Sequence, residues 1–262
     1  MTALVTGASA GIGAAIARVF AANGFDLVLT ARRIDRLEAL AAELEAAHGC
    51  TAHVIVADLS DPSAPARIFD ETARAGLTID ALVNNAGYGL PGGFLSSSWE
   101  EHASFLQVMV TSVAELCRRF APGMVERRRG FIINVASVAG LIPGTAGHTL
   151  YGASKALVVR FSESLALELA PSGVHVTALC PGFTYTEFHD VNRMRAQVST
   201  LPRWMWMDAG TVARQAYDAV MRGDVVCING RVNRAIVALA RYTPQWIVGR
   251  IARRASRKFR KI

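Results

Sequence analysis

The sequence has little of what a secreted, disulfide-bonded or membrane-spanning protein needs. Four cysteines lie far apart in apolar surroundings and form no C-x-x-C pair: Cys50, Cys117, Cys180 and Cys227. We therefore expect buried free thiols, as in a reducing compartment. No uninterrupted run reaches the roughly 18 apolar residues of a spanning helix, and the first residues lack the basic segment of a secretory signal. These absences predict a cytoplasmic protein.

Most of the chain has no excess of basic residues, although the formal net charge is +7. Residues 231–262 hold ten Lys and Arg and no Asp or Glu, which leaves 18 basic and 21 acidic residues in residues 1–230. The body of the protein therefore lacks the basic surface of a nucleic-acid-binding protein, and we expect no such partner. We divide the chain into a domain over 1–230 and a basic C-terminal extension over 231–262.

The extension has apolar residues at near-helical spacing after Pro244, surrounded by arginines and lysines: Ile247, Ile251, Ala255, Phe259 and Ile262. This pattern predicts a basic amphipathic helix. Two interpretations stay open. The helix makes a peripheral contact with an anionic membrane, at its inner surface, or its apolar stripe packs on the domain or on another subunit.

Short apolar runs alternate with helical patterns every 25–40 residues. Six runs are predicted strands, over 3–6, 26–30, 52–57, 81–84, 131–136 and 174–180. Such alternation predicts an α/β fold, a single-domain doubly wound parallel sheet of about seven strands with helices on both faces. Its cofactor half spans about 1–130 and its catalytic and substrate half about 131–230. From 183 to 210 the periodicity fails, which is typical of a functional loop.

A glycine-rich segment follows the first predicted strand. Its spacing, G-x-x-x-G-x-G, puts glycine at a tight turn (Gly7), at the closest backbone approach to a pyrophosphate (Gly11) and at the start of a helix (Gly13). Helix N-terminal amides attract negative charge. The position between strand and helix favours a nucleotide loop over a plain turn, made of Gly7, Ser9, Ala10, Gly11, Ile12 and Gly13.

The second predicted strand lacks the carboxylate that usually holds the ribose of NAD. It ends in Thr30-Ala31-Arg32-Arg33, and the first carboxylate afterwards is Asp35. A guanidinium suits the 2′-phosphate of NADP. Arg32 and Arg33 therefore favour NADP(H) over NAD(H) as the cofactor.

Further motifs follow in order along the chain. They are Asp58-Leu59, Asn84-Asn85-Ala86-Gly87, Ser137, Tyr151-Gly152-Ala153-Ser154-Lys155 and Pro181-Gly182-Phe183-Thr184-Tyr185-Thr186. With the glycine loop, they make residues 1–230 resemble the short-chain dehydrogenase/reductase superfamily, which has a Rossmann-type fold. Thr30-Ala31-Arg32-Arg33 followed by Arg36-Leu37 resembles its NADP-using, carbonyl-reducing branch.

The resemblance also implies contacts with the cofactor beyond the glycine loop. Lys155 would hold the nicotinamide ribose, and Thr186 and the Phe183 backbone would fix the carboxamide. The implied set is Arg32, Arg33, Asp58, Leu59, Asn85, Ala86, Gly87, Tyr151, Lys155, Pro181, Gly182, Phe183, Thr184 and Thr186. The resemblance further implies a homodimer or homotetramer, formed through the helices around 100–125 and 151–170.

Tyr151 and Lys155 are four residues apart, so on a helix they share one face. A nearby ammonium and a positive nicotinamide favour the phenolate of a tyrosine. In the mechanism that the resemblance implies, Ser137 hydrogen-bonds the substrate oxygen, and Tyr151 exchanges a proton with it while the nicotinamide exchanges hydride. We therefore expect an NADP-dependent oxidoreductase acting on a carbonyl or alcohol.

One departure from the family pattern concerns proton supply. The run Val108-Met109-Val110-Thr111-Ser112 has Met109 where the family usually has an Asn that holds a relay water. A thioether is a weak acceptor and no donor. Three alternatives stay open. Thr111 or Ser112 takes over the role of the Asn, water molecules alone relay the proton, or turnover is slow. The alternative function is a cofactor-binding protein with impaired catalysis, acting as a redox sensor or scaffold.

Apolar residues dominate the candidate substrate wall, over 88–95, 141–150 and 183–207. We expect a small apolar carbonyl or alcohol there, contacting Ser137, Tyr151, Phe94 and Phe188. His148 and His189 fit loop or rim positions better than ligand positions, and no spacing indicates a metal.

Overall fold

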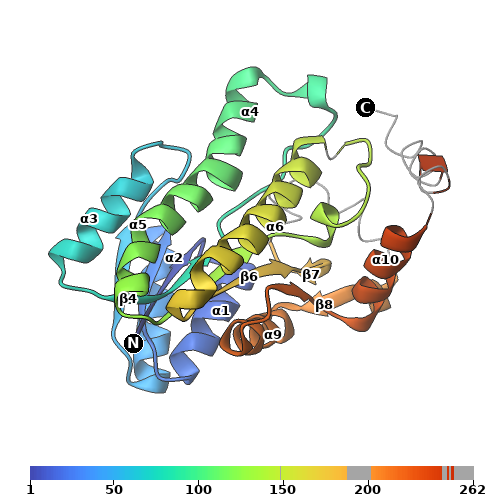
Figure 1. The fold of residues 1–262 in the computed structure, drawn as a ribbon. Coiled ribbons are helices and arrows are strands. Elements are labelled where there is room, and N and C mark those ends of the chain that lie inside the picture. Colours follow the sequence, from blue (N-terminus) through green and yellow to red (C-terminus); the bar gives the residue numbers. More distant parts are fainter. Residues whose placement is uncertain (148, 188–201, 244–246, 248, 251–262) are drawn as a thin grey trace.

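The core of the computed structural model is one seven-stranded sheet, seen edge-on in Figure 1. The structure describes residues 1–147, 149–187, 202–243, 247 and 249–250. The strand order is β3-β2-β1-β4-β5-β6-β9, and every neighbouring pair is parallel. The strands are β1 (Thr2–Thr6), β2 (Asp26–Ala31), β3 (Ala52–Val56), β4 (Ile79–Asn84), β5 (Gly130–Val135), β6 (Val174–Cys180) and β9 (Val226–Ile228).

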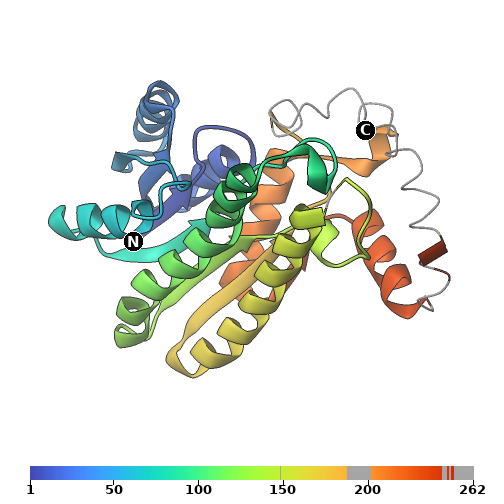
Figure 2. The same cartoon turned by 90° about the horizontal axis from the view of Figure 1, so that it is seen from above.

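Helices cover both faces of this sheet, as the alternating pattern predicts. One apolar cluster joins the sheet to α1 (Gly11–Ala22), α2 (Ile34–His48) and α9 (Ala209–Arg222). A second cluster joins the opposite face to α3 (Ala64–Arg74), α5 (Ser112–Glu126) and α6 (Thr149–Leu169). Figures 1 and 2 show α5 and α6 lying side by side on that face. The predicted doubly wound α/β fold is confirmed.

The strand order reverses between β1 and β4, because the chain builds outward to β2 and β3 and then returns to the other side. In such sheets, ligands bind at the carboxyl ends of the strands beside this reversal. The loops that begin at Gly7, Asn85, Ala136 and Pro181 all leave that edge. Residues far apart in the sequence thereby meet at one edge of the sheet.

The helix before β5 contains a local irregularity. Ser98 begins α4 (Trp99–Leu106) as a capping box: its hydroxyl accepts from the Glu101 amide, and the Glu101 carboxylate accepts from the Ser98 amide. The chain then passes through a π-helical turn (Gln107–Thr111) into α5. Such π-turns inside helices are frequent at functional sites, and this one contains Met109.

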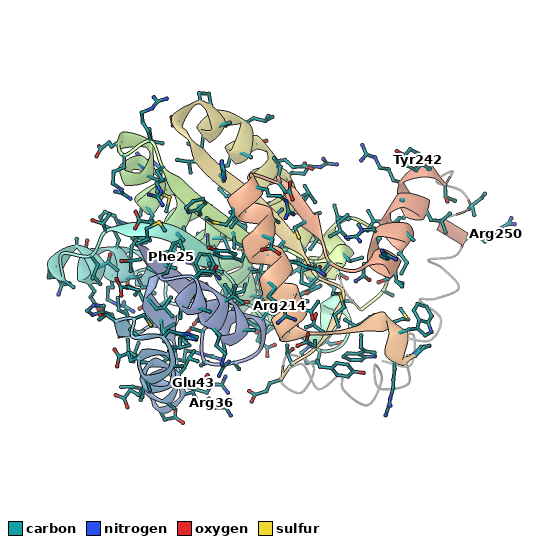
Figure 3. The ribbon with its side chains drawn as sticks, turned by 90° about the horizontal axis from the view of Figure 1, so that it is seen from below. Phe25, Arg36, Glu43, Arg214, Tyr242 and Arg250 are labelled. Carbon is teal, nitrogen blue, oxygen red and sulfur yellow. The ribbon has the colours of Figure 1, made fainter. Side chains whose placement is uncertain are left out.

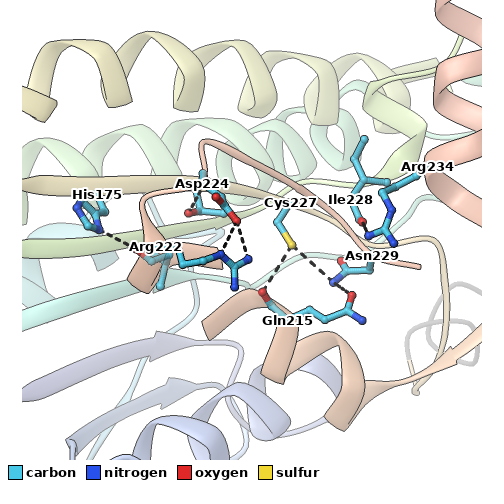
Figure 4. Close-up of polar contacts among 10 residues, drawn as sticks. His175, Gln215, Arg222, Asp224, Cys227, Ile228, Asn229 and Arg234 are labelled. Carbon is cyan, nitrogen blue, oxygen red and sulfur yellow. Dashed lines mark hydrogen bonds and ion pairs between the residues drawn. The ribbon is translucent and has the colours of Figure 1, made fainter. Parts of the chain in front are cut away.

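The edge strand β9 is absent from the six strands that the sequence pattern predicts. It has three residues, all only partly buried, so it shows neither alternation nor a long apolar run. Polar contacts fix it beside α9 (Figure 4): Asn229 Nδ2 donates to Gln215 Oε1 at 3.0 Å, and Cys227 Sγ lies 3.6 Å from the Gln215 carbonyl oxygen. Tertiary contacts rather than local sequence therefore define this strand.

Regular structure also occurs within the 183–210 segment, which the pattern predicts as a loop. Here β7 (Phe183–Tyr185) pairs in parallel with β8 (Trp206–Asp208), and a 3₁₀ turn (Arg203–Met205) precedes β8. Asp208 then caps α9 by accepting from the Gly210 and Thr211 amides. Three-residue strands are too short for a period-2 pattern, which explains why the sequence does not reveal them.

The described part of the extension is a helix, α10 (Arg231–Tyr242), which begins one residue after the boundary expected at 230. Asn233 and Val237 point inward, and Asn233 Nδ2 donates to the Asn229 carbonyl at 2.7 Å. Figure 3 shows Tyr242 and Arg250 at the end of the molecule remote from Phe25. Most of the amphipathic pattern after Pro244 lies outside the described residues. Within the described ranges, no helix is both long and apolar enough to cross a bilayer.

Candidate active site

The glycine loop and the start of α1 form one end of the site. Gly7 and Gly11 have φ values of 65° and 58°, a region that favours glycine. A Cβ on Gly13 would overlap the Gly7 carbonyl oxygen, so the helix begins directly against the loop. Ala10, at the N-cap, gives no side-chain hydrogen bond to the first helical amides. These amides are suited to an anion such as a pyrophosphate.

Asn85 holds the glycine loop in place from the neighbouring strand. Its Nδ2 donates to the carbonyl oxygens of Thr6 and Gly7 at 2.8 and 3.3 Å. The Thr6 hydroxyl accepts from the amides of Asn85 and Ala86 at 2.9 and 3.0 Å. The Asn85 side chain therefore acts as a brace for the loop, and contact with a cofactor is left to the backbone of residues 85–87.

A buried polar network joins the strands to α6 behind the site. Asn84 Nδ2 donates to Asn134 Oδ1 at 2.8 Å, and Asn134 Nδ2 donates to Ser162 Oγ at 2.9 Å. Cys117 lies in the same network, and its burial raises the pKa of its thiol to about 12. A neutral thiol is a poor nucleophile. The network thus fixes the position of α6 relative to β4 and β5.

The structure brings the three predicted catalytic side chains together. Ser137 follows β5 and caps a short 3₁₀ turn (Val138–Gly140), where its Oγ accepts from the Ala139 amide at 3.1 Å. Tyr151 and Lys155 lie on the first turns of α6, and Tyr151 hydrogen-bonds Ser137. A Cβ on Gly140 would come within 2.6 Å of the Lys155 backbone, so close packing holds the turn against α6.

Lys155 is a buried cation that donates a hydrogen bond to the backbone. Its side chain is 5% exposed, and Nζ donates to the Val135 carbonyl at 2.7 Å. Burial lowers the pKa of Lys155 to about 8. Nζ lies 5.9 Å from the centre of the Tyr151 ring. This ammonium is therefore held beside the tyrosine at a cost in desolvation.

Tyr151 is a proton donor in this state of the molecule. Burial raises the pKa of its phenol above the usual 10, and the hydrogen bond with Ser137 opposes that rise. The phenol is consequently protonated at neutral pH, as a general acid for carbonyl reduction must be. Removing that proton in the reverse direction requires additional positive charge, which an oxidised nicotinamide carries.

Arg33 and Arg36 converge on one carboxylate at the nucleotide end. Arg36 Nη1 donates to both oxygens of Glu187 at 2.7 and 2.8 Å, and Arg33 Nη1 donates to Oε2 at 3.2 Å. Arg33 also donates to the Ser9 hydroxyl of the glycine loop at 3.0 Å. The predicted Arg32 points elsewhere, toward Asp58, at 3.8 Å. Two guanidiniums that converge on one anion, with a hydroxyl beside one of them, fit a phosphate group.

Arg36 is absent from the cofactor residues expected from the sequence. Its spacing from Arg33, three residues along a helix, was the available signal, because such residues lie on one face. Figure 3 places Arg36 on the same helix, α2, as Glu43. Asp58 turns back on its own loop, where Oδ1 accepts from the amide and hydroxyl of Ser60. Leu59 is buried in the second apolar cluster.

The segment after β6 lies over the glycine loop. A Cβ on Gly11 would come within 3.1 Å of the Thr186 side chain, and the Thr184 hydroxyl donates to the Gly182 carbonyl at 3.1 Å. Phe183 and Tyr185 face Trp206, with ring centres 5.5 and 4.8 Å apart. The Pro181–Thr186 motif therefore reaches from the end of β6 to the glycine loop.

A small cavity lies beside Tyr151, at the candidate substrate wall. Its walls include Leu90, Phe94, His102, Phe105, Leu150 and Tyr151. Phe94 and Leu150 belong to the predicted wall, whereas His102 and Phe105 on α4 do not. Their three-residue spacing after a capping box was the signal that could have revealed them. Phe188, His148 and His189 lie outside the described residues.

Met109 occupies a buried place in the π-turn. It is 1% exposed, and a Cβ on Gly87 would come within 2.9 Å of its sulfur, so its side chain covers Gly87. Thr111 is exposed. The Ser112 hydroxyl donates to the Val108 carbonyl of its own helix at 2.8 Å. Neither hydroxyl reproduces the buried amide that the family pattern has here.

Thiols and metal ligands do not cluster in the described part of the chain. All four cysteines are free; Cys117 and Cys180 are buried, while Cys50 and Cys227 are partly buried. No group of three or more His, Cys, Asp or Glu there is arranged to hold a metal ion.

Comparisons with known proteins agree with this geometry. Residues 1–196 match the model of the short chain dehydrogenase family. Oxidoreductase UcpA of Salmonella typhimurium is 41% identical over 190 residues, covering 71% of this chain and 70% of its own. Two solved structures superpose over most of the chain.

One is a short-chain dehydrogenase from Sphingobium yanoikuyae in complex with NADPH, with a TM-score of 0.81 and 35% identity, covering 93% of this chain and 96% of its own. The other is the bulky-bulky ketone specific alcohol dehydrogenase from Comamonas testosteroni. It has a TM-score of 0.76 and 32% identity, and the match covers 93% of this chain and 95% of its own. The chain belongs to the short-chain dehydrogenase family.

Proposed function

We propose that this NAD(P)-dependent oxidoreductase uses NADP(H) to interconvert a small carbonyl compound and its alcohol. The observation that carries the proposal is the hydrogen-bonded pair of Ser137 and a protonated Tyr151, with the Lys155 ammonium 5.9 Å from the tyrosine ring. This arrangement supplies a proton donor next to a hydroxyl that can hydrogen-bond the same substrate oxygen. Most of the walls around it are apolar, which supports a substrate with an apolar body.

In the reductive direction the protein residues have separate tasks. Bound NADPH would supply hydride to the carbonyl carbon. Tyr151 gives its proton to the carbonyl oxygen, so the products are an alcohol and NADP⁺, and solvent returns one proton to the tyrosine. Ser137 orients that oxygen by a hydrogen bond. The Lys155 ammonium stabilises the phenolate that Tyr151 leaves behind.

Preference for NADP(H) is supported by the anion site at Arg33, Arg36 and Ser9. The two guanidiniums lie at the end of β2 and the start of α2, where the 2′-phosphate of the cofactor belongs in this fold. The related Sphingobium protein was solved with NADPH bound. Arg36→Ala should weaken NADPH binding several-fold and leave NADH binding nearly unchanged.

The decisive experiment measures nucleotide oxidation against a panel of ketones, aldehydes and steroids, with NADPH and NADH in parallel. We expect turnover with NADPH and a much lower kcat/KM with NADH. Tyr151→Phe should reduce turnover by at least a hundredfold without changing NADPH affinity. Activity that survives this substitution would contradict the mechanism.

A second candidate function is supported by Met109 alone. Its buried thioether stands where a relay amide is expected, as it would in a protein that binds the cofactor but turns over slowly. Intact Ser137, Tyr151 and Lys155 favour the enzyme.

For assembly, we propose a homodimer or homotetramer through the helices around 100–125 and 151–170. Exposed Leu157 and Leu167 on α6, 48% and 76% exposed, support such a contact.

A further inference from the structure

The outward face of α10 carries an apolar stripe that no described residue covers. The stripe has the i, i+3, i+4, i+7 spacing of one helix face, and its exposed members are Ala235, Ala238, Leu239 and Tyr242. Leu239 and Tyr242 are 70% and 82% exposed, and Figure 3 shows Tyr242 at the margin of the molecule. Scattered exposed apolar residues are ordinary, but a continuous stripe on one helix face marks an interaction surface.

The opposite face of the same helix is fixed to the edge of the sheet where the active site lies. Asn233 Nδ2 donates to the Asn229 carbonyl at 2.7 Å, and a Cβ on Gly182 would overlap the Asn233 side chain. A Cβ on Gly230, the residue before the helix, would come within 2.9 Å of the sulfur of Met207 in β8. Figures 1 and 2 show α10 at the end of the molecule away from the N-terminus. The helix is thus anchored through one face and free to bind a partner through the other.

The charged residues of α10 are all basic. Arg231, Arg234 and Arg241 are exposed, and the ion pairs between described residues do not include them. Arg234 Nη1 donates to the Ile228 carbonyl at 3.3 Å (Figure 4), an uncharged partner. Residues 231–262 contain no Asp or Glu. A partner that fits this face therefore offers apolar groups and negative charge together.

This charge decides between the possible occupants of the stripe. A second copy of the chain, related by a two-fold axis, would pair the α10 face with itself and bring the arginines of both helices together. Residues 244–262 of the same chain hold seven Lys and Arg and no Asp or Glu, so their packing on the stripe would also bring like charges together. A bilayer with anionic headgroups supplies acyl chains and negative charge at the same surface.

We propose that the outward face of α10 docks on an anionic lipid surface. Leu239 and Tyr242 enter the boundary between headgroups and acyl chains, while the arginines beside them meet the lipid phosphates. The helix carries three of the ten basic residues of the extension, so the segment after it supplies most of the attraction, and α10 determines how the protein lies on the surface. Because the anchored face of α10 contacts Gly182, this orientation brings the carboxyl edge of the sheet close to the membrane. The docking does not depend on the reaction proposed above.

Vesicle binding by the full chain tests this surface. The double variant Leu239→Gln/Tyr242→Gln removes the large members of the stripe without changing the charge, and both side chains are exposed, so its Tm should match the wild type. With vesicles of phosphatidylglycerol and phosphatidylcholine, we expect the double variant to bind about tenfold more weakly than wild type, because affinity scales with the apolar area buried in the interface. Co-sedimentation over a series of lipid concentrations measures both affinities.

Two further variants separate the stripe from general effects. Val56→Gln is the matched control, because Val56 is 49% exposed on β3, at the opposite edge of the sheet from β9, and its vesicle affinity should stay within about twofold of wild type. Arg234→Gln/Arg241→Gln should weaken binding by up to about fivefold for each arginine at low salt. This loss should shrink as the salt concentration rises, whereas the loss in the double variant should not.

The proposal is overturned if the full chain does not bind anionic vesicles, if the double variant binds them as well as wild type, or if Val56→Gln loses as much affinity. Light scattering in solution checks the other occupant: a lower oligomer mass in the double variant, whatever its vesicle affinity, would assign the stripe to a second copy of the chain. Wild-type mass with weaker vesicle binding supports the lipid surface. Should the double variant have a lowered Tm, the arginine variant decides in its place, and an unchanged vesicle affinity there would refute docking through α10.

Discussion

Glu187 places a carboxylate between the two arginines that we assign to the 2′-phosphate. Hydrogen bonds from Arg36 and, more weakly, Arg33 hold the pKa of this carboxyl below its usual value, so it is ionised at neutral pH. The groups are partly exposed, at 42–47% of each side chain, and an exposed ion pair is worth only about 0.2–1 kcal/mol. A phosphate that binds Arg33 and Arg36 must displace this carboxylate.

Glu187→Gln should therefore tighten NADPH binding. Removing a competing charge worth a few tenths to about 1 kcal/mol corresponds to an affinity gain of about two- to fivefold, with NADH affinity unchanged. Nucleotide fluorescence titration at low ionic strength measures both constants. Glu43→Gln is the control, because Glu43 pairs with Arg18 at 2.7 Å, another exposed carboxylate–arginine pair. Equal gains for both nucleotides would contradict a phosphate role for the arginines.

Met109 provides a second test at the level of one side chain. An asparagine there would restore an amide that donates and accepts hydrogen bonds, so Met109→Asn should raise kcat while NADPH affinity stays constant. The exchange also empties part of a packed site, and we expect a loss of stability of about 1–3 kcal/mol. Met109→Leu keeps the volume without the amide and should not raise kcat. An unaltered kcat in the Asn variant would refute the relay argument.

Single residues differ in how far the sequence reveals them. Ser137, Tyr151 and Lys155 were predictable because each lies in a short motif after a recognisable strand, and the fold brings those motifs together. The Arg36–Glu187 pair joins residues 151 positions apart, and no local pattern carries such a contact. The helical spacing of His102 and Phe105 was visible, but a lone histidine on a helix shows neither its burial nor its hydrogen bond with the Phe94 carbonyl.

Among the elements, length decides what the sequence shows. Strands of five to seven residues, such as β1 and β6, form apolar runs that are visible in the sequence. The three-residue strands β7, β8 and β9 exist because neighbouring elements pair with them, and their sequences alone do not require a strand. The π-turn at Met109 likewise interrupts a continuous helical pattern without a breaker residue.

The helix α10 and the sequence after it allow a test of the basic extension. α10 is held by Asn233 and Val237, so a chain that ends at Thr243 keeps these contacts. The removed segment carries seven arginines and lysines, each attracted to an anionic surface by up to about 1 kcal/mol. The full chain should co-sediment with phosphatidylglycerol vesicles at low salt, and the truncated chain should not.

Vesicles of neutral phosphatidylcholine serve as the control for that experiment, since they lack the anionic surface. Equal sedimentation of full and truncated chains with anionic vesicles would end the membrane interpretation. It would favour packing of the apolar stripe on the domain or on another subunit, the alternative that the sequence leaves open.

At the scale of the whole molecule, the site is assembled at a cost in folding free energy. The sheet brings residues between Gly7 and Thr186 to one edge, and α6 then buries a lysine there. Because the pKa of Lys155 falls from 10.5 to about 8 on folding, the folded state disfavours the ammonium. That penalty is fully present below about pH 8 and disappears as the pH rises toward 10.5.

The free energy of unfolding of the wild-type protein should thus rise by about 2 kcal/mol from pH 7 to pH 9.5, because Lys155 loses its proton over this interval. The Lys155→Met variant has no lysine to titrate and lacks this gain. The difference in free energy of unfolding between the variant and wild type should therefore shift by about 2 kcal/mol in favour of wild type from pH 7 to pH 9.5. Urea denaturation at the two pH values measures the difference. Tyr151→Phe retains Lys155, and Tyr151 titrates above this interval, so that variant should follow the wild type. Parallel pH profiles for wild type and Lys155→Met would show that folding does not lower the pKa of Lys155.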